Sequence, residues 1–148
     1  MSGIRGFLSE MSLLANIHTG DTAETTTITS SAVDMAGYDG CLLITRFATA
    51  NSGNLCKVQQ SSDDGGSDAY ADLTGTSTAS GSSDEVVFVD IQRPKERYLK
   101  FLAVRAGAST ALGSMYAVRY NARSVAVDNT TSGTITGEAH LSPAEGTA

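Results

Sequence analysis

Glu85-Val86-Val87-Phe88-Val89-Asp90-Ile91 is the stretch that decides the fold, together with the apolar run Tyr98 to Arg105 that follows it. Both runs are rich in β-branched and aromatic residues, which favour strands. Between them lies Gln92 to Arg97, where Pro94 has a fixed φ and no backbone donor, so this segment is expected to be a turn. The sequence therefore predicts a β-hairpin over residues 85–105.

Both faces of the expected hairpin are apolar. A strand pair with one wet face alternates apolar and polar residues, so this pair is expected to be covered on both sides. The second cover would come from an N-terminal helix, a long loop or another chain. With Ile91 opposite Tyr98, one face carries Val87, Val89, Ile91, Tyr98 and Leu102, and the other carries Val86, Phe88, Leu99, Phe101 and Ala103.

The rest of the chain repeats short strand patterns separated by Gly-rich turns. Cys41 to Ala50 and Leu55 to Ser61 are expected to form a second hairpin, and Ser114 to Asn121 a further strand. Thr74 to Asp84 has too few large apolar residues to pack a core and is expected to be an exposed loop, with at most a weak strand. This spacing predicts an all-β fold, an antiparallel β-sandwich or jelly roll.

One segment has helical spacing. Apolar residues fall on one face of a helix between Ser2 and Ile17, and this stripe would cover the protein's own core or dock on a neighbouring subunit. The segment from Thr134 onward has almost no large apolar residues and is expected to be an extended tail. The expected organisation is a helical arm at 1–20, a β-sandwich at 21–127 and a tail at 128–148. The stripe consists of Ile4, Phe7, Leu8, Met11 and Leu14.

The composition of the chain limits the classes of partner that it could bind. The 148-residue chain has a formal charge of −6, which argues against nucleic acid and anionic membranes, because both attract basic surfaces. The longest apolar run, Cys41 to Ile44, is far shorter than the roughly 20 residues of a membrane span. Polar residues interrupt the N-terminal apolar positions, so no secretory signal is expected and synthesis in a cytosol is favoured. Cys41 and Cys56 are accordingly expected to be buried, reduced thiols.

Residues that could carry chemistry are scarce. The two histidines, His18 and His140, lie at opposite ends of the chain, and no zinc-hydrolase, Cys-x-x-Cys or serine-hydrolase motif occurs. We therefore expect neither an enzyme nor a cofactor. Asp63, Asp64 and Asp68 lack the ligand spacing of an EF-hand, so we expect a solvated acidic turn and no metal site.

A small basic cluster stands out in this acidic chain. Arg93, Lys95 and Arg97 surround Pro94 at the tip of the expected hairpin. The cluster is interpreted either as a solvated turn or as a docking point for an acidic partner.

Several segments resemble a known family. They are Ser31-Ala32-Val33-Asp34, Gly37-Tyr38-Asp39-Gly40, Lys57 to Ser61, Ala69 to Leu73, Val89-Asp90-Ile91, Arg93-Pro94, Arg97-Tyr98 and Ser142 to Ala148. Together they resemble small proteins encoded beside the major capsid protein of tailed bacteriophages, over residues 30–148. The resemblance implies a capsid decoration, or cement, protein: a β-rich structural protein, commonly a trimer. Such a protein is made in the bacterial host cytoplasm and binds the major capsid protein on the outer surface of the virion.

The candidate interface combines the helical stripe, the basic cluster and two tail residues, Pro143 and Glu145. A homo-oligomer, with a trimer favoured, would also cover the second apolar face of the hairpin. Two alternatives come from other classes: a carbohydrate- or host-surface-binding β-sandwich module, and a phage tail or connector component. The absence of Trp counts against the first, because sugar sites usually need exposed aromatic platforms.

Overall fold

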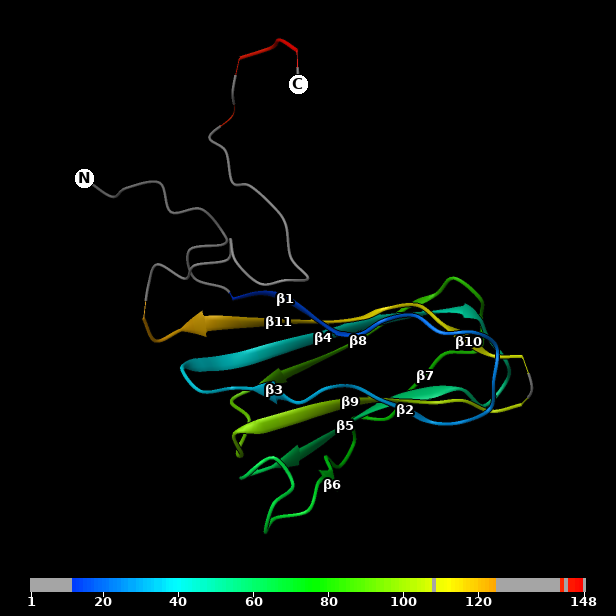
Figure 1. Cartoon of the computed structure of the whole chain (residues 1–148), viewed down its shortest axis with the longest axis horizontal. Coiled ribbons are helices and arrows are strands. Elements are labelled where there is room, and N and C mark those ends of the chain that lie inside the picture. Colours follow the sequence, from blue (N-terminus) through cyan, green and yellow to red (C-terminus); the bar gives the residue numbers. More distant parts are fainter. Residues whose placement is uncertain (1–11, 108, 125–141, 143, 148) are drawn as a thin grey trace.

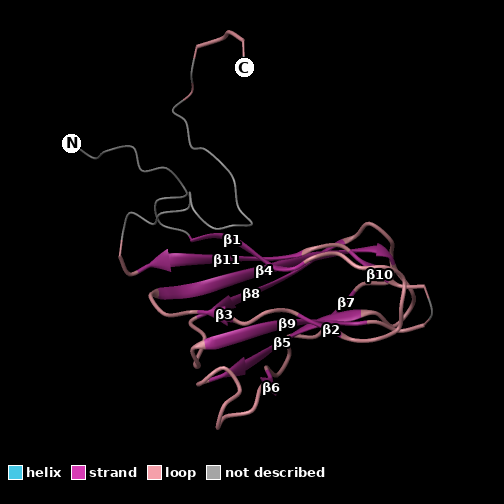
Figure 2. Cartoon of the chain, viewed as in Figure 1, coloured by secondary structure: helices cyan, strands magenta, loops and turns pink. Residues whose placement is uncertain are grey.

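The computed structural model describes residues 12–107, 109–124, 142 and 144–147, and for residues 12–15 the backbone alone. The described chain is all-β, with strands and loops and no helix in Figure 2. The strands are β1 (Ser12–His18), β2 (Ile28–Thr29), β3 (Val33–Asp34), β4 (Tyr38–Thr49), β5 (Leu55–Ser61), β6 (Ala71–Asp72), β7 (Thr78–Ala79), β8 (Val86–Gln92), β9 (Tyr98–Val104), β10 (Ala111–Leu112) and β11 (Met115–Ala122).

The strands form two antiparallel sheets that lie in two layers (Figure 1). In the β4 sheet, β11 and β10 pair with one edge of β4, β8 pairs with the other edge, and β1 pairs with β11. In the β5 sheet, β9 pairs with β5 on one side and with β2 and β3 on the other, while β6 and β7 pair with β5. The two layers make a β-sandwich, as the strand spacing predicts.

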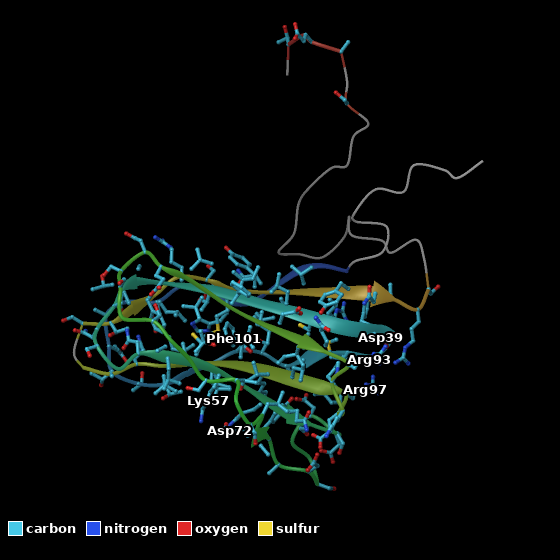
Figure 3. All side chains as sticks on the ribbon, turned by 180° about the vertical axis from the view of Figure 1, so that it is seen from behind. Asp39, Lys57, Asp72, Arg93, Arg97 and Phe101 are labelled. Carbon is cyan, nitrogen blue, oxygen red and sulfur yellow. The ribbon has the colours of Figure 1, made fainter. Side chains whose placement is uncertain are left out.

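The core lies between the two sheets. Phe101 of β9 is fully buried there, as its place between the layers in Figure 3 shows. Alternate residues of each long strand point inward, because side chains alternate across a strand. The largest buried apolar side chains are Phe47, Phe101, Leu43, Leu99, Leu112, Met115 and Val58.

The expected hairpin over residues 85–105 is wrong. β8 pairs with β4 and β9 pairs with β5, so Gln92 to Arg97 crosses from one sheet to the other instead of turning back within one. Sheets in a sandwich are about 10 Å apart, a distance that the five residues between β8 and β9 span easily. The apolar residues of the two strands therefore meet across the core. Val87 and Val89 point inward from one sheet, and Leu99, Phe101 and Ala103 from the other.

The second expected hairpin is wrong for the same reason. β4 and β5 lie in different sheets, and Cys56 pairs in register with Ala103 of β9 rather than with a residue of β4. Cys41 and Cys56 are both fully buried free thiols, as predicted. Burial away from water raises the pKa of each thiol to about 12.

The expected helix is wrong over residues 12–17, where the chain forms β1 and pairs with β11. Leu14 thus lies in a strand, while Ile4, Phe7, Leu8 and Met11 lie outside the described residues. Between residues 12 and 17 only Leu14 belongs to the helical stripe, and hydrogen bonding to a sheet edge overrides so weak a pattern. Ser12–His18 therefore belongs to the β4 sheet, although the sequence assigned it to the helical arm.

Most of the expected tail, residues 128–141, and Pro143 lie outside the described residues, and Glu145 is exposed. Within the described residues, none belongs to a helix that could cross a membrane.

Candidate docking surface

The two outer faces of the sandwich differ in chemistry. On the β5 sheet the outward side chains pair with one another: Lys57 Nζ lies 2.6 Å from an Asp72 oxygen, and Gln59 Nε2 donates to the same carboxylate over 2.7 Å. Lys100 lies over the ring of Tyr70, with its Nζ 4.0 Å from the ring centroid. Figure 3 shows Lys57 and Asp72 together at this surface. This face presents paired charges to water.

The outer face of the β4 sheet carries an apolar strip instead. Residues of β4, β8 and β11 that alternate with buried core residues point outward, and the strand register places Tyr116, Ile44 and Phe88 in one row across the three strands. Val86 and Phe88 are each 61% exposed and Tyr116 is 38% exposed. We call this set the outer strip: Leu42, Ile44, Val86, Phe88, Tyr116 and Val118.

Polar contacts border the outer strip at both ends. At one end the Tyr120 hydroxyl donates to Asp90 over 2.6 Å, and at the other the guanidinium of Arg46 pairs with Asp84. A surface pocket of about 470 Å³ opens on the strip at the Arg46 end, and three strip residues line it together with Arg46 and Ser114. An apolar centre with a polar border is the usual composition of a protein-binding surface. Large exposed apolar groups gathered on one face mark such sites in soluble proteins.

The basic cluster lies at one end of the sandwich, where Figure 3 labels Arg93 and Arg97 near Asp39. Arg97 is not available to a partner in full, because its guanidinium makes two hydrogen bonds to the Asp34 carboxylate, at 2.9 and 2.7 Å. These bonds hold the pKa of Asp34 at about 2. Arg93 and Lys95 are exposed. Of the three predicted cations, one is thus largely neutralised within the chain.

Arg93 also has an unusual backbone conformation. Its φ is +49°, in the left-handed region, and its amide donates to Asp39 O over 2.7 Å. Asn121, at φ +53°, lies on the opposite wall of a surface pocket of about 530 Å³ that Arg93, Asp39 and Tyr120 also line. The cluster therefore sits on a sharply turned loop beside a polar hollow.

The acidic turn is held by its own backbone. The Asp63 carboxylate accepts hydrogen bonds from the amides of Gly66, Ser67 and Asp68 at 3.0, 2.6 and 3.1 Å. These bonds lower the pKa of Asp63. Asp64 accepts the hydroxyl of Tyr70 over 2.7 Å. Asp68 accepts the amide of Ser62 over 2.8 Å, so all three carboxylates make hydrogen bonds within the loop. In the described part of the chain, no group of three or more His, Cys, Asp or Glu side chains could hold a metal ion.

The structure brings only part of the expected interface together. Arg93, Lys95 and Arg97 share one turn, whereas the helical stripe has no described side chains and Glu145 lies far along the chain. Sequence reasoning missed Tyr116 and Ile44 of the outer strip. The signal was present, since Tyr116 and Val118 alternate with the buried Met115 and Ala117, which makes both faces of β11 apolar.

Comparisons with known proteins add no family. No family model matches the chain, and no curated protein sequence matches it.

Proposed function

We propose that this chain is a structural protein of a bacteriophage virion that binds the outer surface of the capsid and stabilises the shell as a decoration protein. The outer strip is the observation that carries the proposal, because a binding protein needs an exposed apolar surface and no catalytic group. The resemblance of residues 30–148 to phage decoration proteins supports the same role. The partner is then the major capsid protein.

The mechanism is mass action. A protein that binds assembled shells but not separate subunits stabilises the assembled state by RT ln(1 + [L]/Kd) at each site. Many identical sites on a shell repeat this small contribution. The outer strip suits such contacts, since Val86 and Phe88 lose their exposed area when a partner surface covers them.

The contrast between the two outer faces gives the orientation. The β5 sheet pairs its own outward charges, as Lys57 does with Asp72, and therefore suits the side that faces water. The outer strip on the β4 sheet faces the shell in this arrangement. Removing the strip from water supplies the favourable free energy of docking.

Two arguments favoured a trimer, namely the family resemblance and a hairpin with two apolar faces, and the structure has no such hairpin. The trimer is then supported by the resemblance alone, while the exposed Val86 and Phe88 of β8 offer an apolar surface to a second copy.

Co-sedimentation tests the proposal. The purified protein is mixed with shells assembled from the major capsid protein of the same genome, and separately with unassembled capsid subunits. We expect the protein to sediment with the shells, to raise their melting temperature, and not to bind the subunits. Absence of binding to shells would overturn the proposal, and density on tails or connectors in electron micrographs of virions would favour the tail alternative.

A further inference from the structure

One edge of the β4 sheet is open. β8 pairs with β4 along its whole length, and no described strand pairs with its other side. Successive residues of a strand direct their N–H and C=O groups alternately to one side and to the other. The amide of Arg93 donates to Asp39 O, which shows that position 93 faces β4. The odd-numbered residues of β8 therefore direct their N–H and C=O groups toward β4. Those of Val86, Phe88, Asp90 and Gln92 point to the open edge.

These same four residues also have exposed side chains. Natural edge strands are usually protected by charged side chains, proline, bulges or a covering loop. On β8 the charged side chain is Asp90, and it already accepts the Tyr120 hydroxyl. An edge with free backbone groups and exposed Val86 and Phe88 is suited to pairing with another strand.

We propose that a second copy of this chain pairs antiparallel with β8 along this edge, with a two-fold axis at Val89. Val89 is the middle residue of β8, so this register pairs all seven residues of both strands. The two β4 sheets then join into one continuous sheet across the axis.

Charge complementarity favours this register. It places Glu85 opposite Arg93 of the partner subunit, on both sides of the axis, and both side chains are exposed. It places Asp90 opposite Phe88 of the partner subunit, so no like charges face each other. A register centred one residue later would bring the two Asp90 carboxylates together. Two ion pairs also offset part of the repulsion between chains of charge −6.

Pairing along β8 would also strengthen binding to a shell, a consequence that rests on the proposed function. The outer strips of two copies come to lie side by side on one sheet, which doubles the apolar surface offered to a shell. Two linked docking surfaces bind more tightly than one, because the second contact is intramolecular.

Sedimentation equilibrium of the free protein tests the inference without shells. We expect a monomer–dimer equilibrium for the wild type. Phe88→Pro removes an amide that points to the open edge and leaves the bonds between β8 and β4 intact, so it should abolish the dimer. Phe88→Ala is the matched control: it removes the same ring but keeps the amide, and should weaken the dimer only a few-fold.

Reversing the charges of the proposed ion pair gives a second test, which does not depend on whether Phe88→Pro folds. Arg93→Glu should weaken the dimer about tenfold, and adding Glu85→Arg should restore it. A wild-type protein that stays monomeric at 1 mM, or that forms a trimer, would overturn the inference. So would a dimer that both Phe88→Pro and Arg93→Glu leave unchanged. Shell binding by a strictly monomeric protein would overturn the dimer while leaving the proposed function intact.

Discussion

The ring of Tyr120 lies directly over Gly40. The two residues are cross-strand partners in the β11–β4 ladder, and a Cβ at position 40 would overlap the ring. Because Gly40 has no side chain, Tyr120 reaches across β4 and donates to Asp90 on β8. This contact ties three strands together at the polar end of the outer strip.

Gly40→Ala should therefore destabilise the protein by about 1–3 kcal/mol. The methyl group forces the ring aside and breaks the Tyr120–Asp90 hydrogen bond. Gly81→Ala is the control, because a Cβ there meets nothing within 4 Å. Urea denaturation measures both variants, and equal stability of the two would show that the packing over Gly40 contributes nothing.

Acid should destabilise the fold through Asp34. Its pKa falls from the usual 3.8 to about 2 in the folded protein because Arg97 donates to it. A carboxyl group with a lower folded pKa stabilises the fold above pH 4, and this contribution disappears as the pH falls from about 4 to about 2. The lowered pKa values of Asp63 and Asp72 act in the same direction.

The ion pair is partly exposed, so its contribution is at most about 1 kcal/mol. Asp34→Asn should flatten the stability curve between pH 4 and pH 2. Arg97→Gln should flatten it less, because the Ala36 amide and the charge of Arg119 still lower the pKa of Asp34. Melting temperatures measured across this range test the expectation, and wild-type and variant curves of identical slope would contradict it.

Arg105 should be the most sensitive of the described charged residues. Its side chain is 1% exposed, and its guanidinium lies 3.0 Å from Asp21 and donates to the carbonyl oxygens of Thr22, Thr26 and Thr110. Arg105→Met removes the donor that these three carbonyl oxygens and Asp21 share, so we expect a loss of about 1–3 kcal/mol.

Arg46→Met is the matched control for Arg105. Arg46 pairs with Asp84 at the surface, where an ion pair contributes less than about 1 kcal/mol. Chemical denaturation should separate the two variants clearly. Similar losses for both would mean that the cluster around Arg105 does not stabilise the fold as its burial indicates.

Chelators should leave the melting temperature unchanged. The oxygens of Asp63 already accept three backbone amides, so the acidic turn has few free ligands to offer calcium. Differential scanning fluorimetry with EDTA and with added calcium tests this expectation. A shift of several degrees in either direction would reveal a calcium site.

The alternation of residues along a strand was readable from the sequence, but the partner of that strand was not. Val87 and Val89 point to one side and Val86 and Phe88 to the other, as the sequence predicts. The five-residue connection with Pro94 fits a hairpin turn as well as a crossing between sheets, and no local pattern distinguishes them. The partner is decided by the whole core, in which Val89 and Phe101 lie in different sheets.

The docking surface was predictable only in part for the same reason. The sequence indicates that an apolar face near Phe88 needs a cover outside the hairpin, and Phe88 is indeed exposed. Leu99 and Phe101, assigned to the same face, are instead buried in the core. Ile44 and Tyr116 join Phe88 only through pairing with β4, which connects residues more than 40 positions apart.

The affinity of Tyr116→Ser for assembled shells tests the docking surface most directly. Tyr116 lies in the outer strip on β11, away from the open edge of β8, so this change leaves strand pairing between copies untouched. Tyr70→Ser makes the same chemical change on the opposite sheet, where Tyr70 packs against Lys100. We predict that Tyr116→Ser raises the Kd for shells about tenfold or more and that Tyr70→Ser leaves it unchanged. Equal affinities for the wild type and Tyr116→Ser would contradict docking through the outer strip.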